Sequence, residues 1–439
     1  MTVDAQSPPA RSQPLDVFLV AGEESGDRLG AALMRALRER TGGKVRFEGV
    51  GGRDMAGEGL RSLYPIDDLP IIGFSAIPRR LPKILRLMRF TARTVVEKRP
   101  DVLVIIDSPG FTRGIARRVR AADPRIPIVE YVSPSVWAWR PGRARVMRRY
   151  IDHILALLPF EPDVHRRLGG PPCSYVGHPL AEQVNDLRPN AEEARRRLGS
   201  PPVLLVLPGS RTGEIRRLLE IFARAVALVR DRVGPLEIML PTVPHLVEPI
   251  RQATAQWPGS PRIVVGAAER QSAFRVARAA LAKSGTVTLE LALAGVPLVA
   301  GYKVSAIEYY AVGRGILKRL PSIILTNLLL GENVVPELLQ HHCTAENLAS
   351  ALIPLFAEGP ERRRQLDAFS RLDGIMEIGA SKPAVRAAIG KAVQSTEFQI
   401  ALANAGQDPA YLDGPDFQKF WDIDGQRTDE AVIWIGRQG

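Results

Sequence analysis

One acidic side chain follows a strand-like apolar run and precedes a tight turn. Residues 102–106 are all apolar and mostly β-branched, Asp107 comes next, and a Ser-Pro-Gly turn follows it. Such a run is typical of a strand buried on both faces of a parallel sheet, and proline ends it. Ligands bind at the carboxyl ends of strands in open α/β sheets, so Asp107 could contact a ligand there. The alternative is that Asp107 only caps the next helix or holds the turn.

A second candidate is a phosphate-binding turn. Gly209, Ser210 and Arg211 follow a strand expected at residues 203–207 and precede a helix expected at residues 214–233. Small residues let the backbone approach a phosphate, a helix N-terminus offers free N–H groups, and an arginine can fork onto phosphate oxygens. Turns of this composition are also common without a ligand, so phosphate binding is a hypothesis at this point.

A similar turn consists of Ser284, Gly285 and Thr286, which follow a short strand expected at residues 279–282. Glu290 lies one helical turn further on, where a carboxylate could accept hydrogen bonds from both ribose hydroxyls of a nucleotide. The alternative is an ordinary helix start in which Glu290 is solvated. Two phosphate-type turns at the carboxyl ends of strands favour a nucleotide site more than either does alone.

The helix expected at residues 81–97 carries a basic face. Arg86, Arg89 and Arg93 share one stripe, and Leu87 and Phe90 flank it. A basic helix with extra apolar side chains could lie on an anionic membrane surface. The alternative is a helix packed on the core with a solvated basic face. A separate apolar stripe consists of Ile84, Leu85, Met88, Ala92, Val95 and Val96.

The elements that position these residues alternate between strand and helix in two successive units. A first unit is expected over residues 15–185 and a second over residues 186–375. A polar tail at residues 1–14 precedes them, and residues 376–439 follow as a helix, expected at residues 383–393, with an extension. This alternation predicts an α/β protein with two Rossmann-like, doubly wound parallel sheets facing a cleft.

The expected elements can be given by residue range. Strands are expected at residues 16–21, 45–50, 102–107, 126–132, 153–157 and 173–176, and again at 203–207, 236–240, 262–266, 279–282 and 296–301. Helices are expected at residues 28–40, 81–97, 214–233, 270–278 and 286–293, with another after Thr112.

The composition favours a globular protein with an anionic partner. The chain has 439 residues and a formal net charge of +12. This balance favours nucleic acid, anionic lipid or a phosphorylated substrate, or else reflects only genome base composition. No apolar run approaches the roughly 18 residues of a membrane span. Cys173 and Cys343 have no metal-ligand neighbours at short spacing, so the sequence predicts neither a disulfide framework nor a zinc site.

An aromatic segment stands between the two candidate sites. Trp137 and Trp139 are followed by Arg140, and prolines lie on either side. The segment could form a pocket wall or serve only as a packing element.

Together these motifs resemble the lipid-A-disaccharide synthase family, whose members join two acylated glucosamine units during lipopolysaccharide assembly in Gram-negative bacteria. The resemblance covers about residues 17–355. It is carried by AGEESGDRLGA at residues 21–31, Gly49 with Gly51 and Gly52, IDSPGFT at 106–112, YVSPSVWAWR at 131–140, LALLPFE at 155–161, VGHP at 176–179, LPGSR at 207–211, SGTVTLE at 284–290 and TNLLLGENVVPELLQ at 326–340.

The resemblance implies a two-domain GT-B fold and an inverting glycosyl transfer. The donor would be UDP-2,3-diacylglucosamine, and the acceptor would be lipid X, which is 2,3-diacylglucosamine 1-phosphate. The products would be lipid A disaccharide 1-phosphate, with a beta-1,6 linkage, and UDP, and no metal or other cofactor would be needed. The enzyme would be cytoplasmic and peripherally bound to the inner membrane, and the family's swapped C-terminal segment implies a homodimer.

Specific residues of this chain match functional positions of that family. Asp107 would be the general base for the acceptor 6-hydroxyl, or would orient it. Arg211 would offset charge on the departing UDP. Glu23 and Ser25 would face the cleft from the first unit. The nucleotide site would include Gly209, Ser210, Ser284, Gly285, Thr286, Glu290 and Asn327. The membrane-facing helix would present Arg86, Met88, Arg89, Phe90 and Arg93.

This chain departs from the family pattern in three places. Gly110 stands where a second acid is usual, Lys283 stands where a small residue usually precedes Ser-Gly-Thr, and the tail after about residue 394 is longer than usual. One alternative function is therefore a GT-B transferase with another acceptor, or an epimerase. Another is an inactive basic paralogue that binds membrane or nucleic acid. Aromatic and basic residues do not interleave as in single-strand binders, so nucleic acid is not expected.

Overall fold

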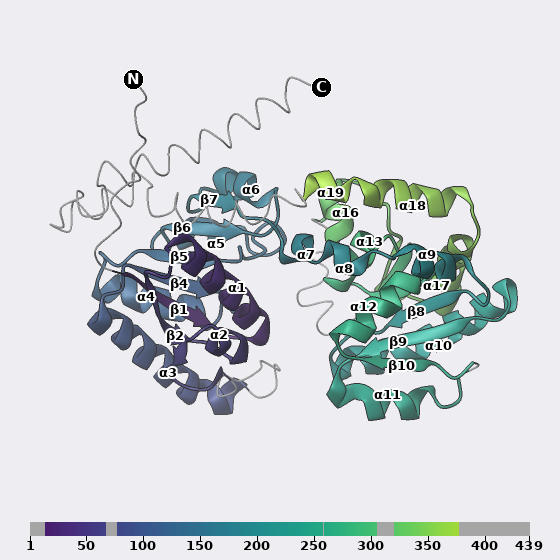
Figure 1. The fold of residues 1–439 in the computed structure, drawn as a ribbon, viewed down its shortest axis with the longest axis horizontal. Coiled ribbons are helices and arrows are strands. Elements are labelled where there is room, and N and C mark those ends of the chain that lie inside the picture. The colour runs from purple at the N-terminus through teal and green to yellow at the C-terminus, as the bar shows by residue number, and fades with distance from the viewer. Residues whose placement is uncertain (1–13, 67–76, 258, 305–319, 377–439) are drawn as a thin grey trace, which may run out of the picture. The chain divides into compact units, whose positions relative to one another are not determined.

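The chain folds into two α/β units, each built on its own sheet (Figure 1). The computed structural model describes residues 14–66, 77–257, 259–304 and 320–376. The division between the units falls between Gly177 and His178, ahead of the boundary expected after residue 185. The helix expected at residues 383–393, the extension to residue 439 and nearly all of the N-terminal tail lie outside the described residues.

The first unit contains a seven-stranded sheet in which every pairing is parallel. Its order is β3-β2-β1-β4-β5-β6-β7. Ala21 of β1 pairs with Ile106 of β4, so these two strands end side by side at one edge of the sheet. The strands are β1 (Leu15–Ala21), β2 (Val45–Val50), β3 (Arg61–Ser62), β4 (Val102–Ile106), β5 (Ile128–Tyr131), β6 (His153–Ala156) and β7 (Cys173–Tyr175).

Helices cover both faces of this sheet. α3 (Ile77–Lys98), α4 (Thr112–Ala122) and α5 (Gly142–Met147) pack on one face, where Met88 and Ile115 join a buried cluster with Leu103 of β4. α1 (Glu24–Arg40) and α2 (Arg53–Gly57) pack on the other face, where Met34 joins Val104. Because successive side chains of a strand point to opposite faces, Leu103 and Val104 serve the two cores in turn. α6 (Glu161–Leu168) contacts α5 and β7.

The second unit repeats this plan with a six-stranded parallel sheet in the order β10-β9-β8-β11-β12-β13. α10, α11 and α17 cover one face, where Phe222 is fully buried. α12 and α13 contact the strands outside this cluster. The expected α/β class with two parallel sheets is confirmed. The strands are β8 (Val203–Leu207), β9 (Glu237–Thr242), β10 (Arg262–Val265), β11 (Ala279–Lys283), β12 (Leu298–Tyr302) and β13 (Glu337–Leu339).

The helices of the second unit are numbered to match Figure 1. They are α7 (Pro179–Glu182), α8 (Val184–Leu187), α9 (Ala191–Leu198), α10 (Thr212–Val233), α11 (Val247–Thr254), α12 (Ala267–Val276), α13 (Val287–Leu293), α16 (Leu325–Leu330), α17 (Ala345–Leu352), α18 (Pro360–Ser370) and α19 (Leu372–Ile375).

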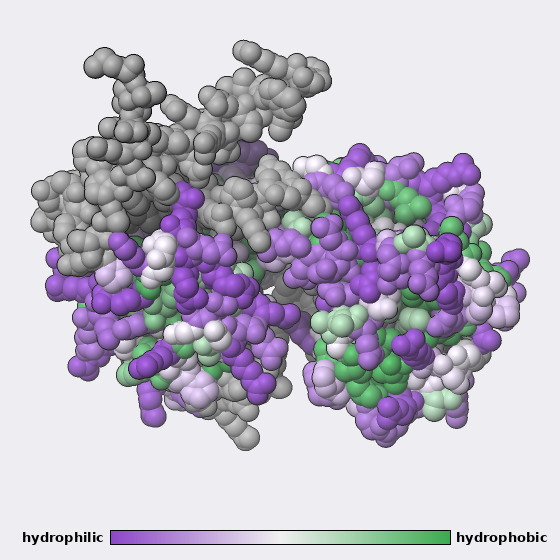
Figure 2. Space-filling view, in the orientation of Figure 1, coloured by the Kyte–Doolittle hydropathy of each residue, from purple (hydrophilic) through white to green (hydrophobic). Residues whose placement is uncertain are grey.

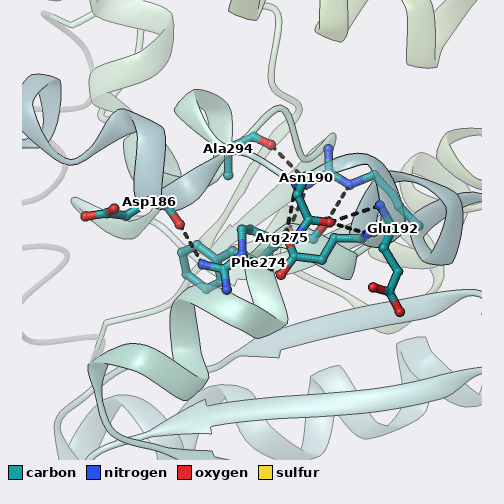
Figure 3. Close-up of polar contacts among 8 residues, drawn as sticks. Asp186, Asn190, Glu192, Phe274, Arg275 and Ala294 are labelled. Atoms are coloured by element: carbon teal, nitrogen blue, oxygen red, sulfur yellow. Dashed lines mark hydrogen bonds and ion pairs between the residues drawn. The ribbon is translucent and has the colours of Figure 1, made fainter.

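The polar segment that follows the first sheet is bonded into the second unit. At the start of α9 the Asn190 side chain accepts the N–H groups of Glu192 and Glu193 (Figure 3). The Arg197 guanidinium donates to carbonyls at the C-terminal ends of α12 and α13, namely those of Phe274, Arg275, Ala294 and Gly295. The Arg275 side chain donates in turn to the Asp186 carbonyl at 2.7 Å (Figure 3). α8 begins at Val184 and contacts α12 and α13, so residues before 186 also belong to the second unit.

The described residues contain neither a membrane-spanning helix nor a cluster of metal-binding side chains. No helix among them is long and apolar enough to cross a membrane. They hold no group of three or more His, Cys, Asp and Glu side chains arranged to bind a metal. Cys173 and Cys343 are free cysteines, and burial raises the pKa of both thiols, which keeps them protonated.

Candidate functional site

Asp107 is the first residue after β4 and is held in an unusual backbone conformation. Its φ is 49° and that of Ser108 is 45°, both in the left-handed region. Each such residue costs on the order of 1–3 kcal/mol and persists only where the surroundings hold it. The Asp107 N–H donates to the Tyr131 carbonyl of β5 at 3.1 Å, and Thr112 Oγ1 donates to the Asp107 carbonyl at 2.7 Å. The backbone of Asp107 is therefore fixed from two directions.

The Asp107 side chain is half-buried and open to a ligand. Within the described part of the chain, its carboxylate has no hydrogen-bond or ion-pair partner. A carboxylate without a protein partner can accept a proton or a hydrogen bond from a bound hydroxyl. No side-chain contact among the described residues supports the alternative in which the Asp107 carboxylate caps the next helix.

The loop between β1 and α1 lies against the Asp107 turn. A Cβ atom placed on Gly22 would come within 2.5 Å of Ser108 Cβ and 2.6 Å of Ser108 Oγ. Glu23 follows Gly22 as the N-cap residue of α1, Ser25 lies in the first turn of that helix, and both are exposed. The structure thus brings the segment that carries Glu23 and Ser25 next to the turn that carries Asp107.

Because Gly22 lies so close to Ser108, one methyl group added at residue 22 should have a strong effect on the reaction rate. Gly22→Ala should lower kcat by about a hundredfold, because a displacement of Asp107 by about 1 Å is enough to misalign a reacting group. The KM for the nucleotide donor should stay nearly unchanged. Steady-state kinetics of the purified variant would measure both values.

The matched control removes the atoms that the new methyl group would strike. Ser108→Gly in the Gly22→Ala background should restore most of the rate, and Ser108→Gly alone should change it little. If the double variant were as slow as Gly22→Ala, the steric explanation would be wrong.

A buried ion pair lies close to Asp107. Arg113 of α4 and Glu130 of β5 are 6% and 1% exposed, and Arg113 Nε donates to Glu130 Oε1 at 2.8 Å. Burial raises the pKa of Glu130, the charge of Arg113 lowers it, and the charge of Asp107 raises it. Because breaking a buried pair leaves an uncompensated charge, this pair resists movement of the strand ends beside Asp107. We did not identify it from the sequence, although an acid inside the apolar run of β5 was a usable signal.

The aromatic segment after β5 packs inside the first unit. Trp137 contacts the edge of the Phe160 ring at 5.6 Å between centroids, and its Nε1 donates to Glu161 Oε1 at 3.3 Å. Burial raises the pKa of Glu161 to about 7. The guanidinium of Arg140 lies 5.0 Å over the Trp139 ring. Trp137 therefore serves as a packing element, which is one of the two roles that the sequence suggested for this segment.

The first phosphate-type turn joins β8 to α10. Gly209 has a φ of 119°, and a Cβ atom there would come within 2.4 Å of Glu214 Oε2. Ser210 N–H donates to Glu214 Oε2 at 3.2 Å. The Arg211 side chain is 83% exposed and lies 3.6 Å from Glu214 Oε1. The positive φ favours glycine at residue 209, and the Arg211 side chain is exposed enough to reach a ligand.

The second phosphate-type turn joins β11 to α13 and lies beside the first. Ala282 of β11 pairs with Leu207 of β8, so both turns start from neighbouring strands at the same edge of the sheet. Ser284 is buried, with Oγ 3.4 Å from Glu337 Oε1. Gly285 leads into Thr286, the N-cap residue of α13. The structure therefore brings the two turns together, as the sequence predicted.

Glu290 is held by a neighbouring helix. The Glu290 side chain is 12% exposed, and its carboxylate lies 3.1 Å from a guanidinium nitrogen of Arg270 in α12. The solvated alternative for Glu290 is therefore wrong. No local sequence pattern indicates Arg270, because the pair depends on how α12 packs beside α13.

Two predicted site residues need correction. The amide of Asn327 is 2% exposed and makes four hydrogen bonds, to Ser322 Oγ, the Val335 carbonyl and the N–H groups of Val334 and Val335. An asparagine amide has no further capacity, so Asn327 holds its loop and is not available to a nucleotide. Met88 is 7% exposed and packs against Gly114 of α4, so it is a core residue and not a membrane-facing one.

The rest of the α3 prediction concerns exposed residues. Phe90 is 49% exposed, and Arg86, Arg89 and Arg93 are exposed. Arg93 is paired with Glu97 at 2.6 Å. Hydrophilic side chains cover most of the displayed face of the first unit (Figure 2). Phe90 is therefore an exposed apolar side chain next to exposed arginines on α3.

Comparison with known families and curated proteins gives a consistent result. The model of the family described as lipid-A-disaccharide synthetase matches residues 17–385. A lipid-A-disaccharide synthase of Rhodopseudomonas palustris (strain BisB18) is 61% identical over 372 residues, covering 85% of this chain and 93% of the relative. One from Rhodospirillum centenum is 43% identical over 401 residues, covering 90% and 98%.

Solved structures share the fold at low identity. A UDP-GlcNAc 2-epimerase from Neisseria meningitidis bound to UDP-GlcNAc matches with a TM-score of 0.58 and 10% identity, covering 86% of this chain and 100% of that one. MurG from Acinetobacter baumannii matches with a TM-score of 0.53 and 18% identity, covering 86% and 100%. At these identities the likeness shows the two-sheet fold alone.

Proposed function

This chain belongs to the lipid-A-disaccharide synthase family, and from that premise we propose how its residues divide the reaction. The enzyme is a hexosyltransferase of lipid A biosynthesis. It transfers 2,3-diacylglucosamine from UDP-2,3-diacylglucosamine to lipid X, and the products are lipid A disaccharide 1-phosphate and UDP. The observation that carries this function is the family match over residues 17–385.

Asp107 acts on the acceptor. Its carboxylate takes the proton of the acceptor 6-hydroxyl while that oxygen attacks C1 of the donor sugar. The bond from C1 to the diphosphate oxygen breaks on the opposite face, which inverts the anomeric centre. The carboxylate of Asp107, which has no partner among the described residues, and its fixed backbone support this role. Glu23 and Ser25, at the start of α1 beside the Asp107 turn, line the acceptor side of the reaction.

Arg211 and the two phosphate-type turns act on the donor. The exposed Arg211 guanidinium forks onto the diphosphate and offsets the charge that grows on departing UDP. Gly209, Ser210, Gly285 and Thr286 bring backbone and hydroxyl groups to the phosphates. Ser284, which is buried against Glu337, holds the second turn in place. Glu290, fixed by Arg270, accepts the ribose hydroxyls. The charge of Arg211 and the N–H groups of the two turns take the part that a metal ion plays in other transferases, so we propose that the reaction needs no metal.

A turnover assay tests the function and the metal-free mechanism together. Purified protein would be mixed with UDP-2,3-diacylglucosamine and lipid X in mixed micelles that contain a chelator. Formation of UDP and disaccharide in equal amounts is expected. Activity that disappears with chelator and returns with a divalent cation would overturn the metal-free mechanism, and UDP binding without disaccharide formation would point to another acceptor.

α3 is the part of the first unit that rests on the cytoplasmic surface of the inner membrane. Arg86 and Arg89 provide positive charge toward anionic lipid headgroups, and Phe90 provides an exposed apolar side chain beside them. Both substrates carry acyl chains that reside in that membrane. A helix of this composition would therefore place the enzyme where its substrates are.

Removal of this charge should weaken membrane binding. The combined variant Arg86→Gln, Arg89→Gln and Phe90→Ser should lose affinity for vesicles of phosphatidylglycerol and phosphatidylethanolamine by about thirtyfold or more, since each arginine contributes about 1 kcal/mol at an anionic surface. Vesicle sedimentation would measure this. The control variant Arg224→Gln with Leu228→Ser alters a similar exposed pair on α10 and should bind as before. Equal binding by both variants would exclude α3 as the contact.

A further inference from the structure

A carboxylate of the chain itself occupies the centre of the first phosphate-type turn. Glu214 Oε2 accepts the Ser210 N–H at 3.2 Å. Glu214 Oε1 lies 3.1 Å from Lys283 Nζ and 3.6 Å from an Arg211 guanidinium nitrogen. The Glu214 side chain is only 12% exposed. Two cationic side chains and one backbone N–H thus already converge on a single negative charge.

Lys283 links this carboxylate to the second turn. It is the last residue of β11, directly before Ser284, and its side chain is 18% exposed. Its Nζ lies 5.3 Å over the Tyr302 ring and 3.5 Å from the point where a Cβ on Gly285 would be. A largely buried ammonium group is costly without an anionic partner, and Glu214 is the partner that the structure provides.

The converging groups have the chemistry of a diphosphate site. Phosphate oxygens carry more charge than one carboxylate and form charge-assisted hydrogen bonds with lysine, arginine and backbone N–H groups. A diphosphate that contacts Arg211 would bring its negative charge close to Glu214, because the two side chains are only 3.6 Å apart. That repulsion would favour movement of Glu214 away from Lys283, and Lys283 would then be left with the phosphate as its partner.

We propose that Lys283 binds the diphosphate of the nucleotide donor, and that Glu214 holds Lys283 in the ligand-free enzyme until the diphosphate displaces it. This inference rests on the proposed role of Arg211 and its turn in donor binding. It assigns a function to a residue at which the chain departs from its family's usual sequence. It also gives the enzyme an internal anion that takes back Lys283 when UDP leaves, which favours product release.

Equilibrium binding of UDP tests the assignment through two opposite effects. Lys283→Met should weaken UDP binding by about tenfold, the loss expected for one hydrogen bond to a charged group. Glu214→Gln should strengthen UDP binding, because the amide keeps the shape of the side chain but no longer competes for Lys283. Lys283→Arg should retain most of the affinity. Isothermal titration of the full chain with UDP would measure all three, and thermal unfolding without ligand would show that each variant is folded.

The outcomes separate this inference from a structural role and from the proposed donor site. If Lys283→Met and Glu214→Gln both weakened UDP binding and both lowered the melting temperature, the pair would be a structural tie between the two turns and the inference would be wrong. If Lys283→Met bound UDP as well as the unaltered chain while Arg211→Ala did not, Lys283 would be excluded as a diphosphate ligand and the role of Arg211 would stand. If neither variant lost affinity, the donor placement itself would fail.

Discussion

Asp107→Asn should lower kcat by about a thousandfold, the middle of the range for loss of a general base. An amide cannot take the proton from the acceptor 6-hydroxyl, although it can still hydrogen-bond to that group. Asparagine is also the substitution that best preserves the turn, because asparagine and aspartate tolerate the left-handed region in which residue 107 lies at a φ of 49°. Disaccharide formation under saturating concentrations of both substrates would measure the loss.

The control measurements separate a chemical defect from a structural one. UDP affinity and the melting temperature of Asp107→Asn should match those of the unaltered chain, since the carboxylate has no partner among the described residues. Asp163→Asn alters an exposed aspartate of α6 and should leave the rate unchanged. A near-normal rate in Asp107→Asn would remove Asp107 as the base and leave it only the role of orienting the acceptor.

The sequence predicted the strands of both sheets except two short strands at sheet edges. The run at residues 203–207 coincides with β8, because a strand buried on both faces is continuous and apolar. β3 (Arg61–Ser62) and β13 (Glu337–Leu339) were missed. Each is short and lies at a sheet edge, and it is a strand only because its neighbour offers a row of hydrogen-bonding groups, which no local pattern reveals.

The boundary between the units lies after Gly177, earlier than expected, because α8 already contacts α12 and α13 of the second unit. Composition alone made residues around 185 resemble the end of a unit. Arg197 bonds to carbonyls near residues 274 and 294, and this contact carries α9 into the second unit. An arginine that satisfies the free carbonyls of helix ends far along the chain has no signature in its own segment.

The candidate site shows the same limit at the level of side chains. The sequence located both phosphate-type turns, because turn residues after apolar strands are local signals. It did not indicate that the Asn327 amide is hydrogen-bonded within its own loop or that Met88 packs against Gly114. It also did not indicate that the Glu214 carboxylate accepts the Ser210 N–H. Each depends on which groups lie nearby after folding, so motif membership alone overstated the number of ligand contacts.

Arg211→Ala should lower kcat by about a hundredfold and weaken UDP binding as well. Preorganised positive charge at the leaving group stabilises the transition state, and loss of one such group costs about two to three orders of magnitude in an oxyanion site. Arg211 is 83% exposed at the start of α10, so truncation leaves no cavity and the fold should be retained. Steady-state kinetics with titration of UDP would separate the effect on rate from the effect on affinity.

Two further variants show whether charge or geometry is responsible. Arg211→Lys keeps the positive charge but loses the planar fork, so an intermediate rate is expected if two phosphate oxygens are contacted together. Arg216→Ala removes an exposed arginine further along the same helix and should have little effect. If Arg216→Ala were as slow as Arg211→Ala, the overall charge of α10 would explain the loss. If Arg211→Lys were as slow as Arg211→Ala, the fork geometry of Arg211 would be essential and its charge alone would not suffice.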